Sequence, residues 1–160
     1  MTFKLSKRSL DRLKGVHPKL VETVNMAIKD PKLKIDFGVT CGVRTLETQK
    51  KLVAQKRSQT LKSKHLMQED NFSHAVDLVA YDDGEVCWEA DVYDDIADAM
   101  LRASKHVDLK LIWGAAWHCP DMRTWSKSCE ELNMQYQKLR LDAGRRPFND
   151  YPHFQCNFDA

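Results

Sequence analysis

The 160-residue sequence has no apolar run that approaches the roughly 18 residues of a membrane span. Its first residues, MTFKLSKRSLDRLKG, include no apolar stretch long enough for a secretory signal, so we expect synthesis and first folding in a cytoplasm. Internal repeats, low-complexity tracts and Pro/Ser/Gly-rich linkers are also missing. We therefore expect one monomeric domain over residues 1–160, without membrane insertion.

Close cysteine pairs are missing as well. The five cysteines are an odd number and include no C-x-x-C spacing. A disulfide framework is typical of secreted chains with an even cysteine count, and a zinc knuckle needs close pairs. We therefore interpret the cysteines as reduced and mostly buried side chains.

The sequence has little net charge, since 25 lysines and arginines face 23 aspartates and glutamates. The charges are segregated, however: residues 1–64 have a net charge of +11 and residues 65–98 a net charge of −11. The basic block could attract a polyanion, but the near-zero total favours two blocks that complement each other in one fold, without a specific nucleic-acid partner. The acidic segment 82–95 lacks EF-hand spacing, so calcium is an option that no motif supports, and we expect the solvated start of a helix there.

Hydrophobic periodicity predicts a mixture of helices and strands. We expect helices near 6–13, 19–30, 45–56, 91–105 and 129–141, a loop over 58–66, and strands near 34–42, 74–82, 109–113 and 152–158. In the first strand Ile35, Phe37, Val39 and Cys41 alternate and are expected to share one side. The helices flank the strands rather than alternating with them, which favours a small α+β domain around an antiparallel sheet.

Several polar residues stand beside the expected strands. His65, Asp77 and His153 each lie in or next to a strand or a loop that leads into one, and strands can bring distant residues onto one sheet face. Two imidazoles and one carboxylate form the three-ligand set of a catalytic zinc ion. His74 and His118 are also possible metal ligands. A lone histidine, however, is more often a structural residue than a ligand.

Two further residues would complete a hydrolytic site. Asp150 precedes His153 by three residues, and a turn at Tyr151–Pro152 would let its carboxylate act as a general base. Arg44 follows the first strand and could bind a substrate carboxylate or stabilise a developing oxyanion.

At these residues the sequence resembles the VanY-type, D-alanyl-D-alanine carboxypeptidase-like zinc peptidases. Within them it is similar to phage endolysins that act as L-alanyl-D-glutamate endopeptidases. Five segments carry the resemblance in the family's order: SLDRLKGVHPKLVETVNMAI, VTCGVRT, SQTLKSKHL with HAVDLVAY, WGAAW and DYPHFQ. The resemblance implies the zinc peptidase fold shared with hedgehog-type and DD-peptidase domains.

The resemblance also implies roles for individual residues. His65, Asp77 and His153 become the ligands of one Zn²⁺, Asp150 the catalytic base, and Arg44 a catalytic and substrate-binding cation. Ser63 and Trp117 match motif positions near the substrate; we expect a supporting hydrogen bond from Ser63, and Trp117, with Trp113, either walls the cleft or belongs to the core.

The sequence departs from the family in three places. Eleven residues separate His65 from Asp77, more than in the family's pattern, so we expect an inserted loop near 66–73 beside the site. The insertion leaves His74 as a second candidate ligand, but His65 keeps the S-x-H motif and is preferred. The segment near 118–146 is long and polar, as a lid or a wall-binding surface would be, and Gln155 replaces the usual glutamate.

The implied function is hydrolysis of the L-alanyl-D-glutamate bond in the peptidoglycan stem peptide by a phage endolysin. Such an enzyme would be made in the host cytoplasm, leave it through a holin, and act on the periplasmic cell wall. Two alternatives stay open: a D-Ala-D-Ala carboxypeptidase or dipeptidase with the same ligands, and a non-catalytic module that binds polyanions through residues 1–64.

Overall fold

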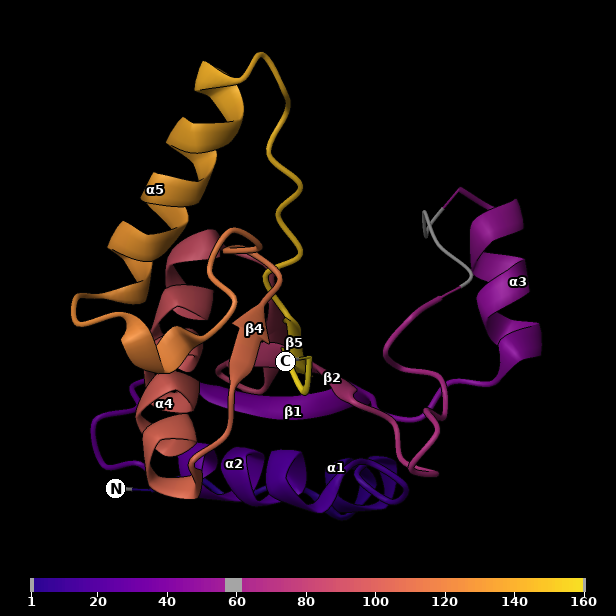
Figure 1. Ribbon diagram of the computed structural model, residues 1–160. Helices are drawn as coiled ribbons and strands as arrows, with labels where there is room; N and C mark the ends of the chain where they lie inside the picture. Colours follow the sequence, from indigo (N-terminus) through magenta and orange to yellow (C-terminus); the bar gives the residue numbers. More distant parts are fainter. Residues whose placement is uncertain (1, 57–61, 160) are drawn as a thin grey trace.

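The structure is a computed structural model that describes residues 2–56 and 62–159, and it is built around a five-stranded sheet (Figure 1). The strands are β1 (Asp36–Cys41), β2 (Ala75–Asp82), β3 (Glu85–Cys87), β4 (Leu111–Trp113) and β5 (His153–Cys156). Their order is β1-β2-β5-β4, with β3 paired to β2, and every pairing is antiparallel. The predicted α+β class with an antiparallel sheet is confirmed.

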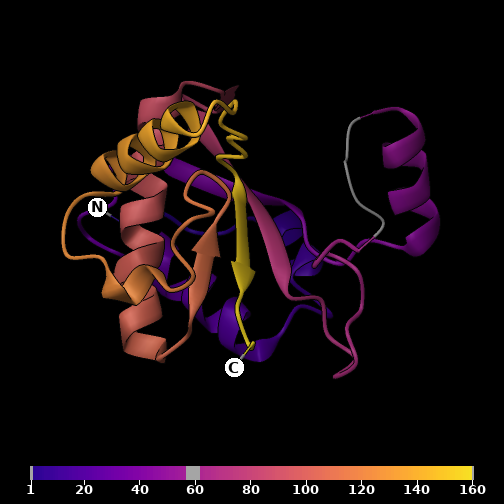
Figure 2. The ribbon, with the colours of Figure 1, turned by 45° about the horizontal axis from the view of Figure 1, so that its top comes forward.

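Five α-helices and one 3-10 helix accompany the sheet in the described part of the chain. They are α1 (Lys7–Arg12), α2 (Pro18–Ile28), α3 (Leu46–Ala54), α4 (Ala90–Val107), η1 (Met122–Thr124) and α5 (Cys129–Asp142). Ser6, His17 and Thr45 cap the first three, because each side chain accepts a backbone hydrogen bond from the first turn. Helices α2, α4 and α5 pack in sequence, whereas α3 stands apart from them and from the sheet (Figures 1 and 2).

The two faces of the sheet have different surroundings, because side chains alternate along a strand. In β2, Val76 and Leu78 belong to the hydrophobic core beneath the helices, and Asp77 lies between them on the opposite face. In β5, Phe154 belongs to the core and His153 precedes it on the opposite face. One face therefore holds the domain together while the other is free to carry polar side chains.

Strand β1 corrects one prediction. Phe37 and Val39 are buried in the core as expected, but the pairing register with β2 shifts between Val39 and Cys41. Such a bulge inserts one residue and turns the following side chain to the other face. Cys41 therefore does not share the side of Phe37 and Val39; it lies opposite Asp77 on the polar face.

The acidic segment contains a hairpin turn and the start of a helix. Asp83 and Gly84 both have positive φ angles, 51° and 79°, and form the tight turn of a hairpin. The chain then continues as β3, a strand that was not expected. Helix α4 begins at Ala90, within one residue of the expected start at 91, so the helix start predicted for this segment lies at its end.

Two of the three expected departures from the family, the inserted loop and the long polar segment, take distinct forms. Residues 66–73 form a loop that includes a bridge between Met67 and Ser73, whereas the loop expected at 58–66 lies partly outside the described residues. Residues 118–146 contain η1 and α5, and α5 buries Leu132, Asn133 and Tyr136. All five cysteines are free, and no helix in the described ranges has the length and hydropathy to cross a membrane.

Candidate active site

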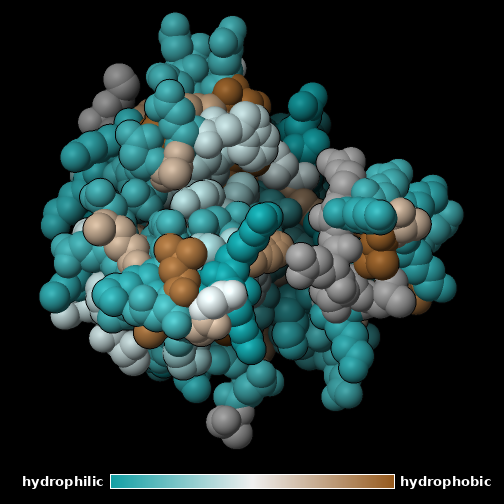
Figure 3. All heavy atoms as spheres, turned by 90° about the horizontal axis from the view of Figure 1, so that it is seen from above, coloured by the Kyte–Doolittle hydropathy of each residue, from teal (hydrophilic) through white to brown (hydrophobic). Residues whose placement is uncertain are grey.

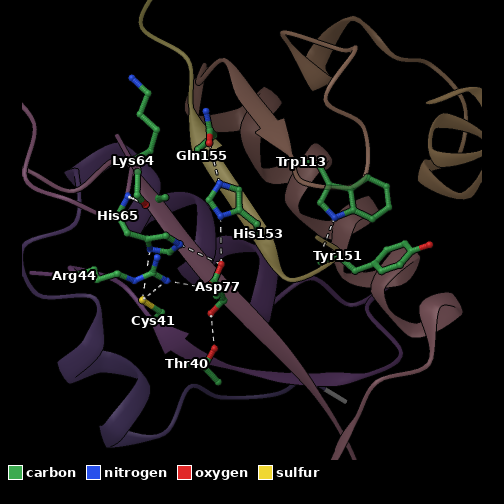
Figure 4. A network of polar contacts seen from close by, with 12 residues as sticks. Thr40, Cys41, Arg44, Lys64, His65, Asp77, Trp113, Tyr151, His153 and Gln155 are labelled. Atoms are coloured by element: carbon green, nitrogen blue, oxygen red, sulfur yellow. Dashed lines mark hydrogen bonds and ion pairs between the residues drawn. The ribbon is translucent and has the colours of Figure 1, made fainter. Parts of the chain in front are cut away.

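Side chains from neighbouring strands form a row across the polar face of the sheet. The register places Asp77 opposite His153 on one side and opposite Cys41 on the other. His65 reaches the same place from the loop before β2, and Figure 4 shows its ring and that of His153 directed at the Asp77 carboxylate. The three residues that the sequence predicts as ligands therefore meet on one sheet face.

The backbone around His65 fixes the orientation of its ring. The His65 N–H donates to Ser63 Oγ at 3.1 Å, and the His65 carbonyl accepts from the Arg44 N–H at 2.9 Å. Ring atom Nδ1 lies 2.9 Å from the carbonyl oxygen of Gly42, which can only accept, so Nδ1 carries the proton. Ring atom Nε2 is then the one that faces Asp77 Oδ1, 3.2 Å away.

His153 is oriented in the complementary way. Its Nε2 lies 2.8 Å from Gln155 Oε1, two residues along β5 on the same face. With Nε2 donating to that oxygen, Nδ1 keeps a lone pair that faces Asp77 Oδ1 at 3.3 Å. The ring of Trp117 covers the imidazole, with ring centroids 5.4 Å apart.

The groups of this cluster together stabilise a positive charge beside the Asp77 carboxylate. Burial disfavours the ionised form of Asp77, but hydrogen bonds with His153 and His65 outweigh burial and hold its pKa well below the usual range. Burial likewise opposes the charged form of His65, yet hydrogen bonds with Asp77 and Cys41 raise its pKa to about 10. A proton or a metal cation between the two ring nitrogens and the carboxylate would supply this charge.

Asp150 is brought to the cluster by a tight turn and a glycine. The Asp150 carbonyl accepts from the His153 N–H at 3.1 Å, and the Asp150 N–H donates to the Gly114 carbonyl at 2.8 Å. A Cβ at Gly114 would lie 2.3 Å from the Asp150 carbonyl oxygen, so only glycine permits this approach. Burial raises the pKa of the Asp150 carboxyl, the charge of His153 opposes this shift, and the charge of Asp77 adds to it.

Arg44 lies on the opposite side of Asp77 from His153. Its Nη2 is 3.7 Å from Asp77 Oδ2 and 3.4 Å from Cys41 Sγ, and its Nη1 donates to Gln49 Oε1 at 2.8 Å. The row therefore combines two imidazoles, two carboxylates and one guanidinium. A metal-assisted hydrolase uses these functional groups.

Comparison with known proteins identifies the family of the chain. A model of the family described as phage L-alanyl-D-glutamate peptidase matches residues 1–131. The chain belongs to this peptidase family. The crystal structure of the Serratia marcescens L-Ala D-Glu endopeptidase ChiX is 31% identical, with a TM-score of 0.68, over 97% of this chain and 91% of that one. No curated protein sequence matches the chain.

The donor set of the peptidase fits a metal ion. Two groups of potential ligands share Asp77: Cys41, His65 and Asp77 form one, and Asp77, Asp150 and His153 form the other. Within each group the ligand atoms lie within 4.8 Å of one another. Nitrogen and carboxylate donors suit a divalent cation, although neither group contains both histidines. Each imidazole has a hydrogen-bond acceptor on its far nitrogen.

The other predicted site residues lie in different surroundings. His74 Nε2 pairs with Asp70 at 2.7 Å, away from Asp77, so the geometry favours His65 as the ligand. Trp113 is fully buried and donates to the Tyr151 carbonyl, which makes it a core residue, whereas Trp117 is 36% exposed beside His153. Ser63 supports His65 through its backbone contact.

Sequence reasoning missed three contributors to the site. Cys41 was grouped with the buried cysteines, because nothing in the sequence reveals the β-bulge that turns it toward His65. Gln49, fully buried, binds Arg44, and its only signal is its place one turn into the helix after VTCGVRT. Gly114 was noticed only as part of WGAAW, although a glycine between two tryptophans already suggests a close backbone approach.

Proposed function

We propose that the chain is a zinc endopeptidase that hydrolyses the L-alanyl-D-glutamate bond of peptidoglycan stem peptides. His65 Nε2, Asp77 and His153 Nδ1 would hold the zinc ion. The ion, when bound, polarises the scissile carbonyl and lowers the pKa of a water molecule. The observation that carries the proposal is the convergence of His65 Nε2 and His153 Nδ1 on Asp77 Oδ1, with Asp150 held alongside by Gly114.

The chain's own residues would divide the remaining work. The Asp150 carboxylate takes a proton from the attacking water and delivers it to the leaving amine, and its raised pKa suits both transfers. The Arg44 guanidinium binds a carboxylate of the D-glutamate side of the substrate. Gly42 and Gln155 hold the tautomers of His65 and His153, and Trp117 shields one imidazole from solvent.

The setting of this activity is part of the same proposal. The enzyme would act as a monomer on the cell wall of a phage-infected bacterium after synthesis in the host cytoplasm. A holin would supply its route to the wall.

The test is digestion of purified Gram-negative peptidoglycan, followed by assays for new amino groups and new reducing ends. We expect new amines whose N-terminal residue is D-glutamate, no reducing ends, loss of product with a chelator and recovery with zinc. Asp150→Asn, loaded with the same amount of zinc, is the matched control and should give no product. Released D-alanine would instead establish a carboxypeptidase, and zinc-independent or absent cleavage would overturn the proposal.

A further inference from the structure

A groove lies beside the active site, between the turn after β4, helix α5 and the chain that leads into β5. Its volume is about 440 Å³. The residues that line it are Trp117, His118, Tyr136, Leu139, Arg140 and Phe148. Four of these have aromatic rings, one has a positive charge, and none has a carboxylate, so the groove suits a neutral ligand with an apolar face.

The groove adjoins the catalytic row at Trp117. Trp117 lines it and at the same time covers the ring of His153. Trp117 Nε1 also donates to the carbonyl of Phe148 at 3.0 Å, and Phe148 precedes Asp150 by two residues. A ligand in the groove would therefore extend directly from a substrate bound at His153 and Asp150.

The strand order gives the site a direction. Arg44 follows β1, Asp77 lies on β2, His153 begins β5 and Trp117 follows β4, which is the order of these strands across the sheet. Arg44 and the groove thus occupy opposite ends of the row, with the proposed ligands between them. A substrate that spans the row has one end at the guanidinium and the other at the aromatic groove.

The chemistry of the stem peptide matches these two ends, on the proposed function. The D-glutamate after the scissile bond has a free carboxylate, whereas the L-alanine before it is joined through a lactyl group to the muramic acid sugar. With the carboxylate at Arg44, only the rest of the alanine and the lactyl group separate the scissile carbonyl from the sugar. We propose that the groove is a subsite for the muramyl sugar, and that Phe148 and Trp117 bind its apolar face.

The groove is preformed on its backbone side. Tyr136 Oη accepts from the Phe148 N–H at 3.1 Å and lies 3.3 Å from the Phe148 carbonyl, and Tyr136 is buried. These contacts fix the main chain of Phe148 and leave its side chain 42% exposed. Phe148→Ala therefore removes a wall of the groove without removing the hydrogen bonds that support it.

The test compares two substrates that differ only in the sugar: N-acetylmuramyl-L-Ala-γ-D-Glu-diaminopimelate and the same peptide with an N-acetyl group in place of the muramyl group. We expect the wild-type enzyme to cleave the muramyl peptide with a higher kcat/KM. Phe148→Ala should lower kcat/KM for the muramyl peptide about five- to tenfold and leave that for the acetyl peptide unchanged. Phe158→Ala, at a phenylalanine that is 50% exposed and outside the groove, should change neither.

The outcomes separate this proposal from the proposed function. Equal losses on both substrates, or equal kcat/KM for both in the wild type, would overturn the sugar subsite while leaving the peptidase function intact. If a second copy of the chain occupies the groove, sedimentation will show a dimer in the wild type and a monomer in Phe148→Ala. That result would also overturn the sugar subsite. Failure to cleave either substrate in the presence of zinc would count against the proposed function itself.

Discussion

The two sides of the active site are built in different ways. On the side of β4, β5 and α5, the catalytic segment rests on the core: Trp113 and Phe154 are fully buried, and their rings stack with centroids 6.3 Å apart. Gly114 exchanges two backbone hydrogen bonds with the Asp150–His153 turn, at 2.7 and 2.8 Å. Asp150 and His153 therefore inherit the rigidity of the core.

The side of α3 has no comparable support among the described residues. Helix α3 stands apart from the body of the domain, and Gln49 is its one buried residue (Figures 1 and 2). Gln49 is also the residue that accepts a hydrogen bond from Arg44. Seen from above, the molecule is mostly hydrophilic, with small separate hydrophobic patches, and α3 forms a lobe of its own (Figure 3).

This difference separates two tasks. Groups that move protons or hold a cation need positions fixed within a fraction of an ångström. Asp77 and His153 lie on strands, and Asp150 lies on the packed side. His65 is held in its loop by backbone hydrogen bonds to Ser63 and Arg44. Arg44 needs only to meet a substrate carboxylate. Its side chain is 15% exposed and contacts Asp77, Cys41 and Gln49, of which Gln49 is the one buried residue of α3.

The largest expected effects lie on the packed side. Asp150→Asn should lower kcat by about 10²–10⁴ because the general base is lost, while zinc content stays stoichiometric. His153→Ala should abolish activity and lose the metal, because only one imidazole and one carboxylate remain as proposed ligands. Metal analysis after gel filtration distinguishes the two variants, and stoichiometric zinc in His153→Ala would contradict the ligand assignment.

Gly114→Ala tests whether the packed side owes its precision to backbone contact. The added Cβ meets the Asp150 carbonyl and His153 Cβ, so we expect kcat to fall about 10²-fold and unfolding to become easier by about 1–3 kcal/mol. Gly144→Ala is the control: its φ is +72° and its surroundings are open. The control should lose about 1 kcal/mol of stability and keep its kcat. An equal loss of kcat in both variants would contradict the claim that the close approach at Gly114 positions Asp150 and His153.

Much of the fold follows from local sequence signals. Helix α2 begins at the predicted His17–Pro18 and buries Leu20, Val24 and Ile28 on one face, because periodicity and caps are local properties. Strand β3 was missed because its three residues are too short to show alternation and depend on pairing with β2. The position of α3 away from the body has no local signal at all.

The site is predictable to the extent that its motifs stand on strands. Asp77 and His153 were expected on one sheet face, and the antiparallel register places them opposite each other. Cys41 could not be placed, since a one-residue bulge reverses the face of every residue after it. Gln49 could not be assigned either, because its partner Arg44 precedes the helix, where helical spacing predicts no contact.

Gln49→Leu tests the other half of the comparison. Without the amide oxygen, Arg44 loses the acceptor that Gln49 provides on α3, and we expect KM to rise about tenfold with kcat and zinc content little changed. Gln55→Leu, at an exposed glutamine at the end of the same helix, is the matched control and should behave as the wild type. A fall in kcat as large as that of Gly114→Ala would show that the two sides are equally demanding.

The smallest effect concerns stability on the packed side, at the start of α4. Burial, together with the negative charges of Glu130, Asp98 and Asp91, raises the pKa of Asp94 to about 7. The folded state therefore binds more protons than the unfolded state between about pH 4 and pH 7, and the free energy of unfolding falls as pH rises through that window. Because Asp94 is half exposed, we expect Asp94→Asn to stabilise the protein by only about 1 kcal/mol at pH 8, and by nothing at pH 4.

Urea unfolding across this pH range measures the effect, with Asp82→Asn, an exposed aspartate at the end of β2, as the control. The control should run parallel to the wild type at every pH. A gain in the free energy of unfolding from Asp94→Asn would show that the negative charges around Asp94 repel one another in the folded state. The buried contacts of the packed side would then outweigh this small repulsion. No gain in the free energy of unfolding at pH 8 would mean that solvent screens these charges. Their repulsion would then cost the packed side no measurable stability.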